Sequence, residues 1–383
     1  MAKTRRVILL IESSRAYGRG LLCGIANYSR LHGPWSFYSE PGGQIRSLKE
    51  VGGWKANGII ARVTDKAALT LKQIGIPAVA IGVDAETVPG LPHIVADGIA
   101  VGRIGAEHLM ERGFKNLAYL GFEKSGWARK RGKSFAERVE QADLNCFIFE
   151  KPRVRGKLSW DAELVHIANW IRSLPKPLGL MACNDDRARH AIEACRTVGI
   201  RVPDEVAVLG ADNDEVLCGL ANPQISSIAI NVERAGYEAA DLLERLIAGE
   251  PMAEQEVIAH PTTVVCRQST DVDALEDKNM ARVLRYIREH SRQLIQVGEI
   301  CEAVAMSRRA LELRFRKVFG HSVYDEIRKV RVEQVARMLA ETNLPVSDIA
   351  KQLGYPSGKH ISRYFRKEKG LTPAEYRLKY GRV

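Results

Sequence analysis

Short apolar runs alternate with longer amphipathic stretches over the first 270 residues of the chain. Apolar runs of about five residues are typical of buried strands, and apolar positions at i, i+3 and i+4 are typical of helices that cover a sheet. The pattern predicts strands at 7–11, 58–61, 78–82, 117–120, 146–149, 178–182, 206–210 and 226–230. It predicts helices at 20–31, 99–111, 128–141, 161–173, 185–198 and 232–248. This alternation indicates an α/β fold with parallel sheets and helices on both faces.

Polar loops follow several of these strands, at 13–17, 127–131, 184–185 and 212–213. So many parallel strands suggest two sheets, and folds of this kind bind ligands outside the carboxyl ends of their strands. The loops offer Ser, Arg, Asn and Asp side chains beside Tyr and Trp rings. That set suits a neutral polyhydroxyl ligand, because each hydroxyl both donates and accepts hydrogen bonds. We therefore expect a sugar-binding cleft at this edge.

Structural roles compete with ligand binding for three of the loop residues. Asp212 could cap the helix that follows it, and Asn184 could be a turn residue; spacing alone favours both structural roles. Arg131 ends the basic run Arg129-Lys130-Arg131, and such runs more often form a solvated surface.

A helical pattern replaces the α/β pattern after residue 279 and contains two helix-turn-helix signatures. In the second, an apolar face over 349–353 ends at Gly354, which can take a left-handed turn, and the apolar face of the next helix covers 361–365. In the first, a helix over 297–304 precedes a reading helix over 308–319. The inward positions of that reading helix are predicted to be Ala310, Leu311, Phe315 and Val318.

The polar residues left on the outer faces of both reading helices suit the major groove of DNA. Those on the first are Arg308, Arg309, Glu312 and Arg316, and those on the second are Lys359, His360, Ser362, Arg363, Arg366 and Lys367. We expect Arg308, Arg309, Lys359 and Arg363 to contact base edges or phosphates, and Arg316, Arg366 and Lys367 to contact phosphates. Ser322 to Asp325 and Thr372 to Glu375 resemble capping boxes, the first opening a long helix that joins the two readers.

The net charge points to the same segment. Residues 280–383 contain 22 Lys plus Arg and 11 Asp plus Glu, whereas the first 279 residues contain 35 of each. The whole charge of +11 therefore belongs to the helical segment, where neutralising phosphates would use it. A solvated basic surface would explain the charge alone, but it does not explain the two signatures.

Length, cysteines and apolar runs limit the class of protein further. With 383 residues the chain is long enough for two or three domains, and no apolar run approaches the ~18 residues of a membrane span. The apolar run at 7–11 is too short for a signal-peptide core. The seven cysteines form no C-x-x-C pair and no zinc-ligand cluster. We expect a cytoplasmic protein with reduced thiols and with neither a metal nor a cofactor.

Particular motifs carry a resemblance to two known families. Val95-Ala96-Asp97-Gly98, Ala182-Cys183-Asn184-Asp185 and Val208-Leu209-Gly210-Ala211-Asp212 resemble the sensor domain of LacI/GalR-type regulators and periplasmic sugar-binding proteins. Ile349-Ala350 with Gly354-Tyr355, and Phe365-Arg366 with Gly370 and Thr372-Pro373, resemble the AraC/XylS DNA-binding domain. Fused in this order, the parts resemble sugar-responsive operon regulators of the D-xylose type.

The resemblance implies a two-lobed sensor over 1–270, a linker over 271–279 and an all-α double helix-turn-helix domain over 280–383. It implies that Arg131, Asn184 and Asp212 bind ligand hydroxyls beneath a closing loop, and we add Ser13, Tyr17, Asp84 and Asp185 as candidates. Asp84 is included because the chain has Gly82 where many relatives place an Asp. Another departure is Leu313, where the DNA-binding family more often has Arg. The implied partners are operator DNA, a pentose sugar, a second copy of the chain in a homodimer and RNA polymerase.

Two other classes of protein fit the sequence less well. An enzyme is disfavoured because Tyr17 to Cys23 lacks the third Gly of a dinucleotide fingerprint, and neither G-x-x-x-x-G-K-[ST] nor G-x-S-x-G occurs. An exported sugar-binding protein is disfavoured by the basic C-terminal segment. The leading interpretation is a sugar-responsive transcriptional regulator, with activation of a pentose operon as the expected output.

Overall fold

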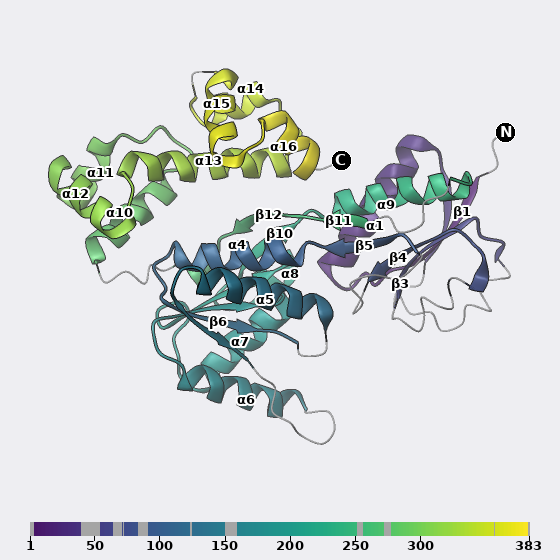
Figure 1. Ribbon diagram of the computed structural model, residues 1–383, viewed down its shortest axis with the longest axis horizontal. Coiled ribbons are helices and arrows are strands. Elements are labelled where there is room, and N and C mark those ends of the chain that lie inside the picture. The colour runs from purple at the N-terminus through teal and green to yellow at the C-terminus, as the bar shows by residue number, and fades with distance from the viewer. Residues whose placement is uncertain are drawn as a thin grey trace. The chain divides into compact units, whose positions relative to one another are not determined.

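The computed structural model describes residues 4–39, 54–63, 71, 73–82, 91–122, 125–149, 159–250, 256–271, 277–355 and 357–381. Internal contacts divide the chain into two units, of which the first covers most of residues 1–272 and the second covers residues 273–382 with Arg112–Phe114. The first unit contains two sheets with helices, and the second contains helices (Figure 1).

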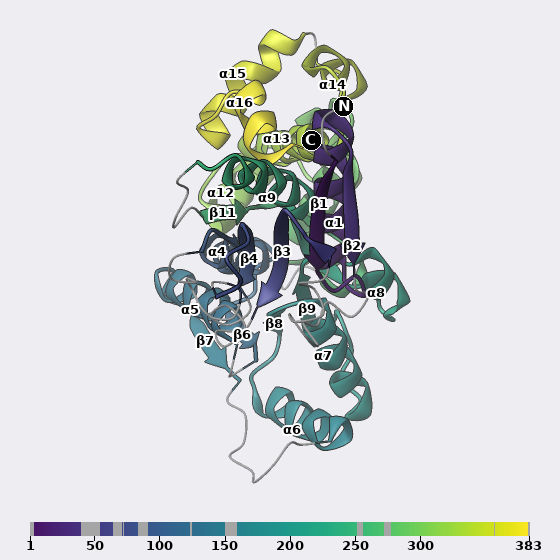
Figure 2. The ribbon, with the colours of Figure 1, turned by 90° about the vertical axis from the view of Figure 1, so that its right-hand side faces the viewer.

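Each sheet of the first unit has six described strands. The first sheet has the order β11-β5-β4-β3-β1-β2 and is parallel throughout, and β1, β2 and β3 can be followed side by side in Figure 2. The second has the order β12-β10-β9-β8-β6-β7 and is parallel except where β12 pairs with β10. The strands are β1 (Arg5–Leu10), β2 (Trp35–Ser39), β3 (Gly58–Val63), β4 (Ala78–Gly82), β5 (His93–Ala96), β6 (Asn116–Leu120), β7 (Asn145–Ile148), β8 (Leu178–Ala182), β9 (Val206–Ala211), β10 (Ser226–Ile230), β11 (Glu256–Ala259) and β12 (Pro261–Val265).

All eight strands predicted from the apolar runs are present, whereas β2, β5, β11 and β12 were not predicted. The helices of this unit are α1 (Ala16–His32), α4 (Gly98–Met110), α5 (Gly126–Glu140), α6 (Trp160–Ser173), α7 (Asp185–Thr197), α8 (Glu215–Leu220) and α9 (Val232–Ile247). Of these, α8 was not predicted.

The helices pack in pairs on the sheets. On the second sheet, α4 packs with α5 and α6 packs with α7, and Figure 1 shows the two pairs on opposite faces. On the first sheet, α1 packs with α9 so closely that a Cβ on Gly24 would lie 1.8 Å from the Glu233 carbonyl oxygen. A Cβ on Gly236 would lie 2.2 Å from the Leu21 carbonyl oxygen, so both helices need a glycine at this crossing.

The chain passes between the sheets at Asp97, Asn231 and His260 in the described part of the first unit. These crossings lie side by side, because the Asp97 amide donates to the Ala259 carbonyl (3.0 Å) and the Asn231 amide donates to the His260 carbonyl (2.9 Å). The unit therefore has two lobes: lobe 1 holds the first sheet with α1 and α9, and lobe 2 holds the second sheet with α4 to α8. The two-lobed fold expected from the sequence is confirmed.

The second unit contains two helical cores that share one long helix. The helices are α10 (Lys278–Glu289), α11 (Val297–Val304), α12 (Arg308–Phe319), α13 (Val323–Glu341), α14 (Val346–Gln352), α15 (Gly358–Lys369) and α16 (Pro373–Tyr380). The start of α13 packs in one core with α10, α11 and α12, and its end packs in the other with α14, α15 and α16. Ser322 and Asp325 form the predicted capping box of α13, and Thr372 and Glu375 form that of α16.

Two of the four inward positions predicted for α12 are wrong. Leu311 and Phe315 are fully buried, but Ala310 is exposed and Val318 is 40% exposed. Leu311 and Phe315 are one helical turn apart and fill the contact with the neighbouring helices, so the flanking positions remain at its edge.

Candidate ligand pocket and DNA-reading helices

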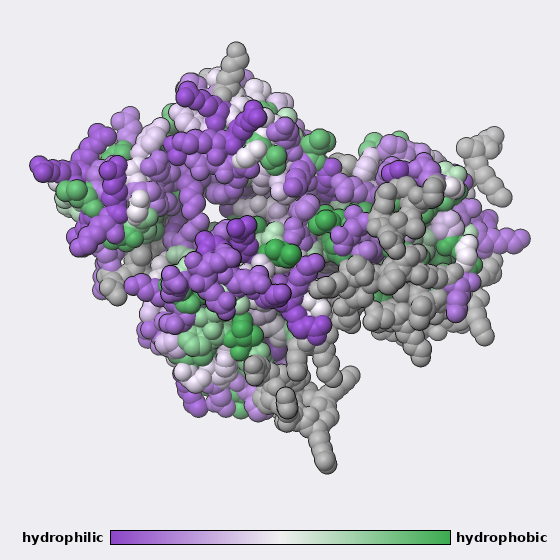
Figure 3. All heavy atoms as spheres, viewed as in Figure 1, coloured by the Kyte–Doolittle hydropathy of each residue, from purple (hydrophilic) through white to green (hydrophobic). Residues whose placement is uncertain are grey.

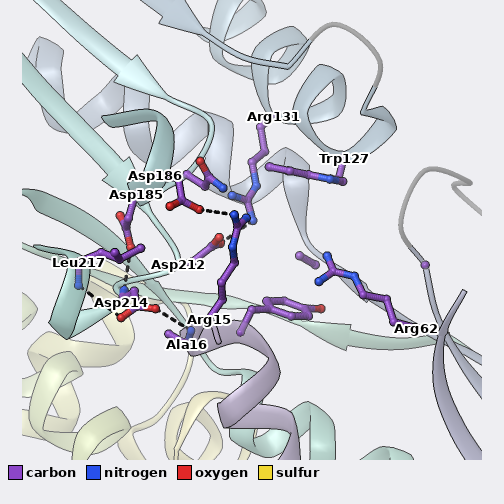
Figure 4. A pocket seen from close by; sticks show the side chains of 14 residues that line it. Arg15, Ala16, Arg62, Trp127, Arg131, Asp185, Asp186, Asp212, Asp214 and Leu217 are labelled. Carbon is purple, nitrogen blue, oxygen red and sulfur yellow. Dashed lines mark hydrogen bonds and ion pairs between the residues drawn. The ribbon is translucent and has the colours of Figure 1, made fainter. Parts of the chain in front are cut away.

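A pocket of about 710 Å³, partly open to solvent, lies between the two lobes at the carboxyl ends of the strands (Figure 4). Its size is within the usual range of small-molecule sites. The residues that line it are Arg15, Ala16, Tyr17, Arg62, Gly82, Ala96, Trp127, Arg131, Asn184, Asp185, Asp186, Asp212, Asp214 and Leu217. Cations from both lobes and carboxylates from lobe 2 thus face one cavity.

Arg131 is the most strongly held cation of the pocket and is only 2% exposed. One guanidinium nitrogen donates to the Asp212 carboxylate (2.9 Å) and another donates to the Cys183 carbonyl (2.5 Å). The Trp127 ring lies 5.0 Å from the guanidinium carbon, in cation–π range. The Nε of Arg131 has no hydrogen-bond partner among the described residues. The run that contains Arg131 is therefore not simply a solvated surface, because its last member points inward.

The loop that carries Asp212 has an unusual backbone. Asp212 and Asn213 have φ angles of 93° and 48°, in the left-handed region that few side chains other than Asn and Asp adopt. The Asn213 amide donates to the Ser227 hydroxyl (3.0 Å), and the Asp214 amide donates to the Asp185 carboxylate (2.7 Å). The cap of α8 is Asp214, so the structural role considered for Asp212 belongs to its neighbour.

Asp185 lies on the pocket floor and is 2% exposed. Its carboxylate accepts hydrogen bonds from the Ser227 hydroxyl (2.5 Å) and the Asp214 amide. Burial raises the pKa of the Asp185 carboxyl to about 8, and the nearby Asp212 carboxylate adds to this rise. Burial likewise raises the pKa of Tyr17 to about 12, so this phenol keeps its proton and can both donate and accept.

Polar contacts cross the cleft from lobe 1 to lobe 2. Arg15 pairs with Asp186 (2.9 Å), and Arg19 pairs with Asp214 (3.0 Å). The Asp214 carboxylate also accepts from the Ala16 amide (2.8 Å) at the start of α1. Figure 4 shows Arg15 paired with Asp186, and Asp214 beside Ala16.

Five of the seven ligand candidates from the sequence line this pocket: Tyr17, Arg131, Asn184, Asp185 and Asp212. Asn184 is also the cap of α7, because its side chain accepts from the Arg187 amide. Ser13 is exposed and does not line the pocket; its carbonyl accepts from Arg19. Asp84 lies outside the described residues.

Other lining residues were missed from the sequence, among them Arg62, Asp186 and Asp214. Arg62 lies near the carboxyl end of β3, and Asp214 lies two residues after Asp212. The criterion used for the other candidates, a polar side chain in the segment after a predicted strand, should therefore have selected both residues.

The DNA-contact candidates lie on the two helices expected to read DNA. On α12, Arg308, Arg309 and Arg316 are exposed and Glu312 is half-buried. On α15, His360, Arg363, Arg366 and Lys367 are exposed, and Ser362 is half-buried with its hydroxyl donating to the Gly358 carbonyl. Lys359 lies on α15, but its side chain is outside the described part of the structure.

The basic residues on α12 and α15 differ in whether a carboxylate of the described structure pairs with them. Among the described residues, no ion pair involves Arg308, Arg309, Arg316, Arg363, Arg366 or Lys367, named here the reader cations. Other cations of the unit are paired: Arg314 with Asp277, Arg328 with Glu368 and Lys369 with Glu333. Figure 3 shows mainly hydrophilic side chains over α12 and α15. The reader cations thus carry positive charge that no ion pair in the described part of the chain neutralises.

The described residues include no helix with the length and apolar content to cross a membrane. They also include no cluster of three His, Cys, Asp or Glu side chains placed to hold a metal ion.

Comparisons with known proteins cover both units. Family models match a XylR N-terminal domain over 6–99, a periplasmic binding protein-like domain over 106–270 and a helix-turn-helix domain over 300–379. The xylose operon regulatory protein of Escherichia coli K12 is 31% identical over 383 aligned residues, covering 98% of this chain and 97% of that protein. The same protein of Haemophilus influenzae is 29% identical, covering 97% of this chain and 98% of its own.

A solved structure described as the xylose-binding transcription activator xylR is 29% identical, covers 99% of both chains and has a TM-score of 0.63. The alignments thus run along nearly the full length of these relatives. The chain belongs to the family of xylose operon regulatory proteins and is a sugar-responsive transcriptional regulator.

Proposed function

We propose that this chain activates a xylose-utilisation operon: D-xylose binds in the pocket between the lobes and changes how α12 and α15 bind operator DNA. The observation that carries the proposal is the buried Arg131–Asp212 pair in the pocket, together with the unpartnered Nε of Arg131. A buried donor without a partner is costly, and a sugar hydroxyl would satisfy it. The relatives described as xylose regulators support the same ligand.

The ligand roles follow from the chemistry of each lining group. Arg131 would donate to hydroxyls, Asp212 would accept from them, and Asn184 would do both. The Tyr17 and Trp127 rings would cover the apolar face of the sugar. Ser13 has no place in this proposal because it does not line the pocket.

The output would come from the reader cations. Arg308, Arg309 and Arg363 would contact base edges or phosphates, and Arg316, Arg366 and Lys367 would neutralise phosphates. Lys359, His360, Ser362 and Glu312 would add polar contacts in the groove. We propose a homodimer in the cytoplasm, because two copies of a reader pair fit a two-fold operator, and contact with RNA polymerase to activate transcription.

A sugar panel combined with two variants tests the proposal. D-xylose should raise the melting temperature of the full chain more than L-arabinose, D-ribose or D-glucose, since a ligand specific for the native state stabilises it. Arg131→Ala should lose this shift and the sugar response but still bind DNA, whereas Arg363→Ala should lose DNA affinity and keep the shift. Loss of both functions in either correctly folded variant would contradict the assignment of sensing and reading to separate units.

A further inference from the structure

The last residues of the first unit, 266–271, are named here the exit segment because the chain continues from them to α10. They contain η2 (Gln268–Thr270), a single 3₁₀ turn in which Ser269 and Thr270 are fully buried. The Ser269 hydroxyl donates to the Val208 carbonyl on β9 (2.6 Å) and accepts from the Ser226 amide on β10 (2.8 Å). The Ser269 amide donates to the Gln224 carbonyl (2.9 Å). The exit segment is thus fixed to β9, which ends beside the pocket residue Asp212, and to the neighbouring strand β10.

Arg267 connects this segment to the loop Asp212–Asp214, named here the ligand loop. One guanidinium nitrogen donates to the Asn213 side-chain oxygen (2.9 Å), and another donates to the Ile225 carbonyl (2.9 Å). Its own amide donates to the Ser226 hydroxyl (2.8 Å). The residue beside the pocket carboxylate Asp212 is therefore bonded directly to a residue of the exit segment.

The ligand loop has left-handed backbone at two non-glycine residues, Asp212 and Asn213. Left-handed backbone at non-glycine residues is strained and persists only where neighbours hold it. Here it is held from outside the loop, by Ile228, Ser227 and Asp185, and by Arg267 through Asn213. On the pocket side, the Asp212 carboxylate is bonded to Arg131. A ligand that bonds to Asp212 or Arg131 therefore acts on the same loop to which Arg267 is hydrogen-bonded through Asn213.

We propose that Arg267 couples the sugar pocket to the DNA-binding unit, through its hydrogen bond to Asn213 at one end and its place in the exit segment at the other. The inference rests on the proposed sugar-sensing function and names the residues by which occupancy of the pocket reaches the linker. Arg267 does not line the pocket, so its role is positioning rather than ligand contact. Sugar and DNA affinities are then linked reciprocally.

The test breaks the bond from each side. Arg267→Met removes both guanidinium donors, and Asn213→Gly removes only the acceptor while keeping a residue that accepts the left-handed backbone. D-xylose affinity is measured by calorimetry on the full chain. DNA affinity is measured by fluorescence anisotropy, with and without D-xylose, on a fragment that the wild-type chain selects from random duplex DNA.

D-xylose should change the DNA affinity of the wild type, and this change should be at least about fivefold smaller in both variants. Fivefold is the lower end of usual coupling factors. D-xylose affinity should stay within about threefold, since the pocket lining is intact. Hydrogen exchange of the Ser269 amide should change on sugar addition in the wild type and not in the variants. Should Arg267→Met fail to fold, Asn213→Gly still tests the same bond.

Arg196→Met is the matched control. Arg196 also lies in lobe 2 and donates to a loop carbonyl, that of Asn222 (2.9 Å), but it contacts neither the ligand loop nor the exit segment in the described structure. It should keep the full response. If both test variants keep the full effect of D-xylose on DNA affinity, or if Arg196→Met loses as much of it as they do, this inference is overturned while the proposed function stands. A wild-type chain that binds no pentose would overturn the proposed function and this inference with it.

Discussion

Asp185 is a residue whose charge state near neutral pH is changed by the fold. Burial raises its pKa to about 8, with Asp212 adding to the rise, whereas a carboxyl in the unfolded chain has a pKa of about 3.9. Between these values the native state holds a proton that the unfolded state has lost, so stability falls as pH rises. The contribution is fully present below about pH 4 and is lost as pH rises through about 8.

We expect the melting temperature of the wild type, relative to that of Asp185→Asn, to decrease as pH rises from about 5 to 9. Comparison with Asn cancels the titration of all other groups, because an amide cannot ionise. The measurement is a thermal scan of both full chains at several pH values. A difference that does not change with pH would mean that the bonds from Ser227 and the Asp214 amide keep Asp185 ionised throughout.

At this scale the sequence predicted pocket residues in the segments that follow strands, although Arg131 lies on α5 and not in a loop. Tyr17, Arg131, Asn184, Asp185 and Asp212 line the pocket, as expected for loops at the carboxyl ends of parallel strands. Roles that depend on a distant partner could not be predicted. Nothing local in the sequence shows that Asp214 accepts from Arg19 and the Ala16 amide, nearly 200 residues away, or that Asn213 accepts from Arg267.

The turns of the two helix-turn-helix motifs differ in one residue that matters for stability. Ala305 ends α11 with φ of 53°, and Gly354 follows α14 with φ of 69°. An L-residue in this region is strained by roughly 1–2 kcal/mol, partly offset by the greater freedom of Gly in the unfolded chain. Ala305→Gly should therefore stabilise the second unit by about 0.5–1 kcal/mol, and Gly354→Ala should destabilise it by about 1 kcal/mol.

Urea unfolding of the full chain, followed through the transition of the helical unit, measures both changes. Steric effects do not confuse the comparison, because Ala305 is exposed and a Cβ on Gly354 would meet its nearest neighbour, Leu294, at an ordinary 3.6 Å. The same sign for both substitutions would contradict the strain argument.

Arg331 on α13 joins the two reader cores from inside the protein. It is 4% exposed and donates to the Leu353 carbonyl in the second turn (2.6 Å) and to the Gln293 carbonyl before α11. Its guanidinium also lies 4.3 Å from the Tyr355 ring. Arg331→Met would leave buried carbonyls unpaired, at about 1–3 kcal/mol each, and would loosen one reader against the other.

We expect Arg331→Met to lower DNA affinity at least about tenfold although Arg331 is too buried to touch DNA, because 1.4 kcal/mol corresponds to tenfold. Arg328→Met on the same helix breaks a pair with Glu368 nearer the surface and should change DNA affinity by less than about twofold. Anisotropy titration of both variants at one salt concentration tests this, and equal effects would contradict the assigned role of Arg331.

Elements with strong periodicity were predictable, and short or exposed ones were not. The buried strands and long helices follow from their apolar runs, whereas β2 has four exposed residues of five and β5 and β11 have only four residues each. Such strands form because a neighbour supplies hydrogen bonds, a tertiary effect that local pattern does not contain.

At the scale of the whole molecule, residues 1–279 are neutral and residues 280–383 carry +11, so sugar binding and DNA binding should respond differently to salt. D-xylose is uncharged, and its affinity should hardly change between about 50 and 200 mM KCl. DNA binding releases counterions, with a slope of about −0.9 in log affinity against log salt for each phosphate neutralised. If all six reader cations contact phosphates, the slope approaches about −5 per protomer.

Removal of single cations separates the reader cations from the other basic residues. Arg366→Ala should make the slope less steep by about 1, because a free cation that meets a phosphate is lost. Arg314→Ala should leave the slope unchanged, because Arg314 already pairs with Asp277 within the unit. Titrations of operator DNA at four or more salt concentrations give both slopes. Equal slopes for the two variants would mean that ion pairing within the unit does not decide which cations bind DNA, and that total charge alone does.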